Sequence, residues 1–166
     1  MASVNSVVIV NMRRLTSRLA TLRRLSWADR WLLLQAGLVV VAVSLSLRVV
    51  SFQRAHAVLR RLTPRADRRV TPDAGLAPAR VLDVARLVNM ASRHTPLPNT
   101  CLHRSLALWW LLERRGFESS LQFGARKREG AFEAHAWVEH GGLVVSDDRA
   151  EHDYERLPWM PLKHDA

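Results

Sequence analysis

The stretch Trp31–Leu47 is the most apolar part of the chain, and it constrains the fold more than any other segment. Arg48 closes it, and Ser51, Gln53 and Arg54 follow after two valines. The run is somewhat shorter than the roughly 20 apolar residues that a membrane-spanning helix needs. A secretory signal would begin its apolar core sooner and add a small-residue cleavage site. We therefore expect a buried helix of a soluble domain that continues through Val49 to Leu62, although contact with lipid stays open.

Length and composition point to one ordinary globular domain with a possible tail. The chain has 166 residues, of which 48% are hydrophobic and 24% are charged. These values exclude collagen-like, low-complexity and wholly disordered chains. The single cysteine, Cys101, excludes an internal disulfide and any zinc site built from several cysteines. It also favours a reducing compartment, so we expect a cytoplasmic protein.

The positive charge is confined to the first half of the chain. Residues 1–80 hold fourteen arginines against three acidic residues, a net charge of +11, whereas residues 81–166 carry −1. The charge therefore belongs to a basic arm or face attached to a nearly neutral second half. Almost all of the basic residues are arginines, a bias that a GC-rich genome can produce as easily as phosphate recognition. Together with the uneven distribution of charge, this argues against a nucleic-acid-binding protein.

Changes in composition divide the chain into five segments. Pro64 ends the first helical region, and the Pro-rich segment that follows has the character of a linker. We expect a basic N-terminal segment at 1–26, an apolar helical region at 27–62, a linker at 63–78, a catalytic core at 79–154 and a tail at 155–166.

The second half of the chain has the pattern of helices followed by strands. Apolar residues recur at helical spacing from Ala79 to Ala91. A second helix begins at Cys101, with Asn99 or Thr100 as its cap, and Gly116 stands where it should stop. Three short β-like runs separated by turns come next, at 121–125, 131–139 and 143–147. These elements predict an α+β fold in which the Cys101 helix packs on a small antiparallel sheet.

The residues of the second half also suggest nucleophilic catalysis. Cys101 lies in the first turn of its helix, where the helix dipole and unpaired N–H groups favour a thiolate. His135 stands inside a predicted strand between two alanines, which suits a fixed general base. Asp147 or Asp148, near the end of the next strand, could orient that base. Strand parity alone does not choose between the two carboxylates.

A metal site is the obvious rival for a Cys, His and Asp set. One thiol, one histidine and one carboxylate would supply only three mixed ligands, without any closely spaced pair. The remaining histidines stand in polar or irregular surroundings and are expected at the solvated surface. We therefore expect no metal and no cofactor.

Three stretches of the chain together resemble one family. They are Pro98–Leu108, Leu111–Phe117 and Phe132–Glu139, the last of these followed by Gly142 and Asp147. Their combination is similar to the transglutaminase-like leader peptidases of lasso-peptide biosynthesis, the B proteins of those clusters. The resemblance is strong over residues 79–148, and it covers neither residues 1–26 nor the tail.

The resemblance implies a papain-like, transglutaminase-like cysteine-protease fold with Cys101 as nucleophile, His135 as base and Asp147, rather than Asp148, as the third member. Such enzymes cut the leader from a ribosomally made precursor, and a separate ATP-dependent cyclase then closes the ring. Because the first 100 residues have no strand-rich module, we expect the split type, which works with a separate leader-recognition protein. The basic half would contact a partner protein, the leader peptide or an anionic membrane surface.

Two other functions fit the same residues. A thioester on Cys101 could pass to an amine instead of water, as in transglutaminases, because the nucleophile and base are the same. Alternatively, the chain could be a non-catalytic scaffold whose basic half holds an acidic peptide. The sequence favours the peptidase by resemblance alone.

Overall fold

The structure is a computed structural model that describes residues 25–63, 77–95, 97, 100–146 and 154–157. The chain divides into two compact units, Met1–Leu32 and Leu33–Ala166. Residues 1–24 of the expected basic segment, most of the expected linker and the end of the tail lie outside the described residues. In the first unit, Ser26 caps the start of a helix: the Asp29 N–H donates to Ser26 Oγ (3.1 Å), and the Ser26 N–H donates to the Asp29 carboxylate (3.3 Å).

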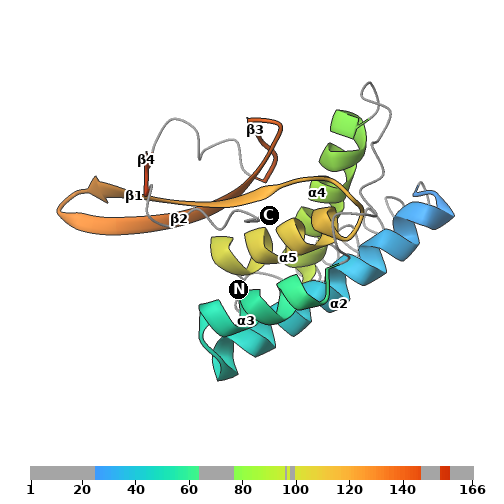
Figure 1. The fold of residues 1–166 in the computed structure, drawn as a ribbon, viewed down its shortest axis with the longest axis horizontal. Coiled ribbons are helices and arrows are strands. Elements are labelled where there is room, and N and C mark those ends of the chain that lie inside the picture. The colour runs from blue at the N-terminus through green and yellow to red at the C-terminus, as the bar shows by residue number, and fades with distance from the viewer. Residues whose placement is uncertain (1–24, 64–76, 96, 98–99, 147–153, 158–166) are drawn as a thin grey trace, which may run out of the picture. The chain divides into compact units, whose positions relative to one another are not determined.

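The second unit is an α+β domain, as the sequence predicts. Its elements in chain order are α2 (Trp27–Val49, which begins in the first unit), α3 (Phe52–Arg61), α4 (Ala77–His94), α5 (Cys101–Glu113), β1 (Ser120–Arg128), β2 (Ala131–His140), β3 (Leu143–Val144) and β4 (Glu155–Arg156). The strands form one antiparallel sheet in the order β3-β2-β1-β4. Figure 1 shows the long β1–β2 hairpin, with α5 lying between this sheet and α3.

Two turns built on positive φ angles set the register of the sheet. Glu129 (φ 52°) and Gly130 (φ 85°) join β1 to β2, and Gly141 (φ 57°) and Gly142 (φ 82°) join β2 to β3. Two-residue turns of this kind match the twist of antiparallel strands. The resulting ladder pairs Gly124 with His135 and continues without interruption along β1.

The prediction of a single helix from Trp31 to Leu62 is wrong, because the helix is interrupted at Val50 and Ser51. Ser51 has an extended backbone (φ −63°, ψ 153°), and its carbonyl accepts the first hydrogen bond of α3 from the Ala55 N–H at 3.0 Å. A serine preceded by two valines ends one helix and begins the next, since serine favours the N-cap position and valine is a weak helix former. The prediction overlooked this start signal.

The expectation that α2 is buried holds for only one of its sides. Its buried residues are Ala36, Val40, Val43 and Ser44. Leu34, Leu38 and Leu45, on another side of the helix, are about half exposed or more. By length and composition alone, α2 would qualify as a membrane-spanning helix, and only 22% of its most apolar window is buried inside the protein.

α5 is the hydrophobic centre of the domain and is tied to its neighbours by hydrogen bonds. Its buried side chains include Leu106, Leu108, Trp109, Leu111 and Leu112, all almost completely buried. The Trp110 Nε1–H donates to the Leu59 carbonyl of α3 (3.1 Å), and Arg115, just after α5, donates to the Gln35 side chain of α2 (2.7 Å). The Glu113 carboxylate accepts from the Ser119 N–H (2.7 Å) and so holds the connection to β1.

Two further expectations need correction. His56 was expected at the solvated surface, but it is buried, with its ring between Phe52 of α3 and Trp109 of α5. Aromatic side chains from another helix can bury a histidine ring even where its neighbours in the sequence are polar. The segment after Tyr154 was expected to be a loose tail, but Glu155–Arg156 forms β4 on the edge of β1.

Candidate functional site

Cys101 is the first residue of α5, and the helix start around it is capped as predicted, with Thr100 as the N-cap. The Thr100 N–H donates to His103 Nδ1 (3.3 Å), and the Thr100 hydroxyl lies 2.7 Å from the same nitrogen. His103 thus takes the place that glutamate or glutamine usually has in a capping box. Partial burial and then the nearby Arg48 guanidinium lower the pKa of His103, which favours the neutral ring that can accept these hydrogen bonds.

Ser105 fixes the Cys101 helix to β2. Its hydroxyl is fully buried and donates to the Ala136 carbonyl at 2.8 Å. Val138, two residues further along β2, uses both backbone groups on the β3 side: its N–H donates to Ser146 Oγ and its carbonyl accepts from the Val145 N–H. Alternate residues of a strand direct these groups to the same edge, so Ser105 binds the edge of β2 that faces β3.

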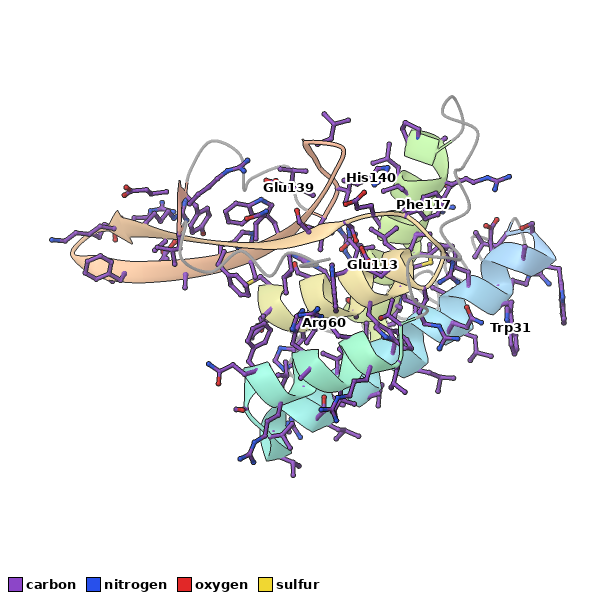
Figure 2. The ribbon with its side chains drawn as sticks, in the orientation of Figure 1. Trp31, Arg60, Glu113, Phe117, Glu139 and His140 are labelled. Atoms are coloured by element: carbon purple, nitrogen blue, oxygen red, sulfur yellow. The ribbon has the colours of Figure 1, made fainter. Side chains whose placement is uncertain are left out.

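α5 runs along β2 in the same direction as the strand. Past the end of α5, the Phe117 ring packs edge-on against His140 (centroids 6.1 Å apart), and the His140 Nδ1–H donates to the Glu118 carbonyl at 2.6 Å. Figure 2 shows Phe117 and His140 beside each other where the helix and the strand both end. The first turn of α5 therefore lies toward the His135 end of the strand, while the His135 side chain itself shares a face of the sheet with Trp137. Residues four apart share a helix face, so Cys101 and Ser105 both face this edge.

The ring of His135 is held between two aromatic side chains. Trp137 stacks on it at 6.2 Å with an interplanar angle of 19°, and Tyr154 stacks at 4.9 Å and 22°. The Arg126 guanidinium covers the Tyr154 ring at 4.6 Å and pairs with the Glu133 carboxylate at 2.6 Å. These contacts fix the plane of the imidazole. They also explain why the chain returns to the sheet at Tyr154.

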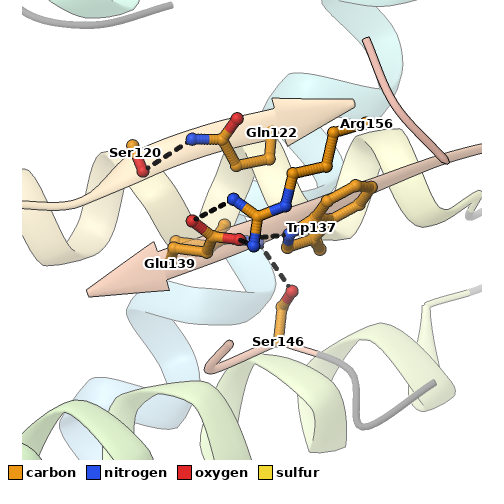
Figure 3. A network of polar contacts seen from close by, with 7 residues as sticks. Ser120, Gln122, Trp137, Glu139, Ser146 and Arg156 are labelled. Carbon is orange, nitrogen blue, oxygen red and sulfur yellow. Dashed lines mark hydrogen bonds and ion pairs between the residues drawn. The ribbon is translucent and has the colours of Figure 1, made fainter. Parts of the chain in front are cut away.

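Trp137 is positioned by a second set of contacts, drawn in Figure 3. Its Nε1–H donates to the buried Glu139 carboxylate at 2.8 Å, and Arg156 of β4 pairs with the same carboxylate at 2.8 Å. The indole also lies over Gly124, the partner of His135 in the ladder, where an added Cβ would come within 2.8 Å of the ring. Only glycine at 124 leaves room for this ring.

A cavity of about 410 Å³ lies between α4 and the residues that follow β3. Its lining carries two arginines and a histidine but no acidic side chain among the described residues: Leu82, Ala85, Arg86, Asn89, Met90, Arg93, His94, Val145 and Ser146. The buried Asn89 Oδ1 has no hydrogen-bond partner in the part of the chain that the structure describes. The cavity therefore combines an apolar wall with positive charge.

The structure describes two of the three residues expected in the triad. Cys101 and His135 are placed as above, whereas Asp147, like its rival Asp148, lies outside the described residues. Within the described ranges no group of three or more His, Cys, Asp or Glu side chains could hold a metal ion. Sequence reasoning missed Ser105, Tyr154 and Arg126 as site residues. Only Ser105 carried a signal, because it lies one helical turn after the cysteine.

The comparison with protein families agrees with this arrangement. The model of the transglutaminase-like superfamily core matches residues 37–158, which include α3–α5 and all four strands. The chain belongs to the transglutaminase-like superfamily. Members of this superfamily are typically cysteine-dependent enzymes, so the transglutaminase-like domain carries its cysteine at the start of α5 in keeping with that chemistry. No curated protein and no solved structure matches the chain significantly.

Proposed function

We propose that this transglutaminase-like domain is a cysteine peptidase that removes the leader from a ribosomally made lasso-peptide precursor. The observation that carries the proposal is the Ser105–Ala136 hydrogen bond, which fixes the helix that begins at Cys101 to the strand that contains His135. The family match over residues 37–158 supports cysteine chemistry, and the three motifs of the sequence support the precursor as substrate. Because the precursor is made by ribosomes, the reaction belongs in the cytoplasm.

In the proposed reaction, His135 takes the proton of the Cys101 thiol, and the sulfur attacks the scissile carbonyl at the leader–core junction. The carbon–nitrogen bond breaks as the imidazolium returns the proton to the amine of the core. Water, deprotonated by His135, then hydrolyses the thioester and releases the leader. The Cys101 N–H at the helix start would stabilise the oxyanion, a contribution of about 2.7–4 kcal/mol in known cases. Asp147 would orient His135.

The cavity beside α4 is the proposed site for the peptide. It borders Ser146, which binds the β2 backbone two residues past Ala136, and so lies at the same edge of the strand as Ser105. Arg93, together with Arg86 beside its ion-pair partner Asp83 (3.5 Å), gives it a positive potential that favours acidic side chains in the substrate. Leader recognition would come from a separate protein, and the core would pass to an ATP-dependent cyclase.

Mass spectrometry of a cognate precursor, incubated with this protein and the separate leader-recognition protein, tests the proposal. We expect cleavage at one junction by the wild type and at least a thousandfold slower cleavage by Cys101→Ala. Asp147→Asn and Asp148→Asn, assayed in parallel, decide which carboxylate serves. Equal cleavage by Cys101→Ala would exclude the thiol mechanism.

The acyltransferase alternative is decided in the same assay by adding hydroxylamine. A thioester on Cys101 that favours amines over water would give the leader hydroxamate as the main product, and a peptidase would give the free acid. A precursor that binds but remains uncut and unmodified would contradict both reactions and leave the scaffold.

A further inference from the structure

The exposed side of α2 forms an apolar stripe that the catalytic site does not use. The stripe consists of Leu34, Leu38, Leu45 and Val49, which are 53%, 63%, 48% and 85% exposed. In a helix of about 3.6 residues per turn these residues fall opposite the buried Ala36, Val40, Val43 and Ser44. The same spacing continues in the sequence to Trp31 and Trp27. An exposed apolar surface of this extent marks an interaction site.

The surroundings of the stripe are uniformly positive. The sequence has no aspartate or glutamate between positions 30 and 66. Arg48 of α2 and Arg54, Arg60 and Arg61 of α3 are exposed, and none of them pairs with an acidic side chain in the part of the chain that the structure describes. Figure 2 labels Arg60 on α3. The partner must therefore tolerate or neutralise several arginines.

The side chains of the stripe distinguish between classes of partner. Protein interfaces form about one hydrogen bond per 100–200 Å². The exposed residues of α2 between Leu34 and the closing Arg48, however, are Leu38, Ala42 and Leu45, none of which can form a side-chain hydrogen bond. A second copy of this chain would bring arginines against arginines. An apolar surface without polar groups, flanked by cations, instead fits the boundary between acyl chains and anionic headgroups.

The attachment of α2 to the domain determines how such contact would occur. Ala36, Val40 and Val43 are buried, and the Gln35 side chain accepts from Arg115 at the end of α5. A helix held along one side cannot cross a bilayer on its own. We propose that α2 lies in the plane of an anionic phospholipid surface, with its apolar stripe in the acyl boundary and the arginines of α2 and α3 at the headgroups. This inference does not depend on the proposed peptidase reaction.

Flotation of the full chain with lipid vesicles tests the proposal. We expect binding to vesicles of phosphatidylcholine with phosphatidylglycerol, much weaker binding to phosphatidylcholine alone, and a decrease with added salt. Leu38→Glu should reduce the partition coefficient about tenfold or more, because it removes an inserted leucine and adds a negative charge. Leu143→Glu is the matched control, since Leu143 is also 63% exposed but lies on β3.

A charge series tests the second half of the proposal. Arg54→Gln/Arg60→Gln should weaken binding to anionic vesicles about tenfold or more. Lys127→Gln/Arg128→Gln, at the exposed end of the β1–β2 hairpin, should leave binding unchanged. Absence of flotation at low salt, or an equal loss with Leu143→Glu, would overturn the proposal. So would a dimer in light scattering that Leu38→Glu dissociates while vesicles remain unbound, because the stripe would then be an interface between copies.

Discussion

At the scale of single residues, the ring of His135 depends on neighbours that are distant in the sequence. Trp137 and Tyr154 both stack on this ring, and Gly124 leaves the space in which the Trp137 indole lies. Ser105 joins the cysteine helix to the same strand. We expect these residues to hold the site in place without taking part in the reaction. Substitutions at Gly124 and Ser105 test this positioning role.

Gly124→Ala should destabilise the fold and slow the reaction. An added Cβ would lie 2.8 Å from the Trp137 ring and 3.0 Å from the Glu155 carbonyl, so the indole must move away from His135. We expect a loss of about 1–3 kcal/mol in the free energy of unfolding, measured by urea denaturation, together with a lower kcat.

Gly37→Ala on α2 is the control for this substitution, since nothing lies within 4 Å of the added methyl group. There the free energy of unfolding should rise by about 0.5–1 kcal/mol, because glycine weakens a helix interior. A Gly124→Ala protein as stable as the wild type would contradict the tight contact between the indole and β1.

Ser105→Ala should leave the Ala136 carbonyl without the hydroxyl that it accepts from. Such a loss in a buried site costs about 1–3 kcal/mol of unfolding free energy. Because the Cys101 turn would no longer be held on β2, kcat should fall while KM stays nearly constant. Ser120→Ala, which removes only an acceptor for the Gln122 side chain, should change neither quantity measurably. A stable Ser105→Ala enzyme with normal kcat would exclude this positioning role.

At the scale of elements, the start of α5 contains a cap that responds to pH. The His103 ring must be neutral at Nδ1 to accept the Thr100 N–H, and the pKa of His103 is lowered in the folded chain. Between that lowered pKa and the unfolded value of about 6.5, the unfolded chain binds more protons than the folded one. The free energy of unfolding contributed by the cap is therefore complete above about pH 6.5 and is lost as the pH falls.

Comparing wild type with His103→Gln isolates this effect, because glutamine preserves a capping box and does not titrate. Urea denaturation at pH 8 and pH 5 should show a larger acid-induced loss of stability for the wild type than for the variant. The other histidines are common to both proteins, so their titration cancels in the difference. Equal pH dependence would exclude His103 as the titrating cap.

At the scale of the whole molecule, charge is divided between two surfaces with different expected tasks. The arginines of α2 and α3 flank the apolar stripe, whereas Arg86 and Arg93 of α4 line the cavity near β3. Substitutions in one group should therefore leave the other function intact.

Arg86→Glu/Arg93→Glu should raise KM for the precursor about tenfold or more, because reversing both charges repels an acidic segment in the cavity. Values of kcat at saturating substrate should change little. Arg80→Glu on the same helix, outside the cavity lining, is the control and should leave KM unchanged. A KM that responds equally to both variants would show that the effect is general electrostatics and not binding in the cavity.

Local signals in the sequence were sufficient for much of the second half of the domain. The start of α5 at Cys101 and the hairpins at Gly130 and Gly141–Gly142 depend on capping and turn chemistry, which act within a few residues. The assignment of Asp147 stays a prediction, and the domain limits inferred from composition also stay predictions. The break at Ser51 was also a local signal, but the long apolar pattern on both sides concealed it.

The sequence by itself determined the α+β class, the capped cysteine helix and the strand that carries His135, because backbone hydrogen bonding and periodicity depend on near neighbours. Only the tertiary structure decided that Ser105 binds β2, that Tyr154 returns to stack on His135, and that His56 is buried while half of α2 is exposed. Those outcomes depend on contacts between segments far apart in the chain. Which side of an apolar helix meets a neighbour is settled by packing, and packing has no signature in a single stretch of sequence.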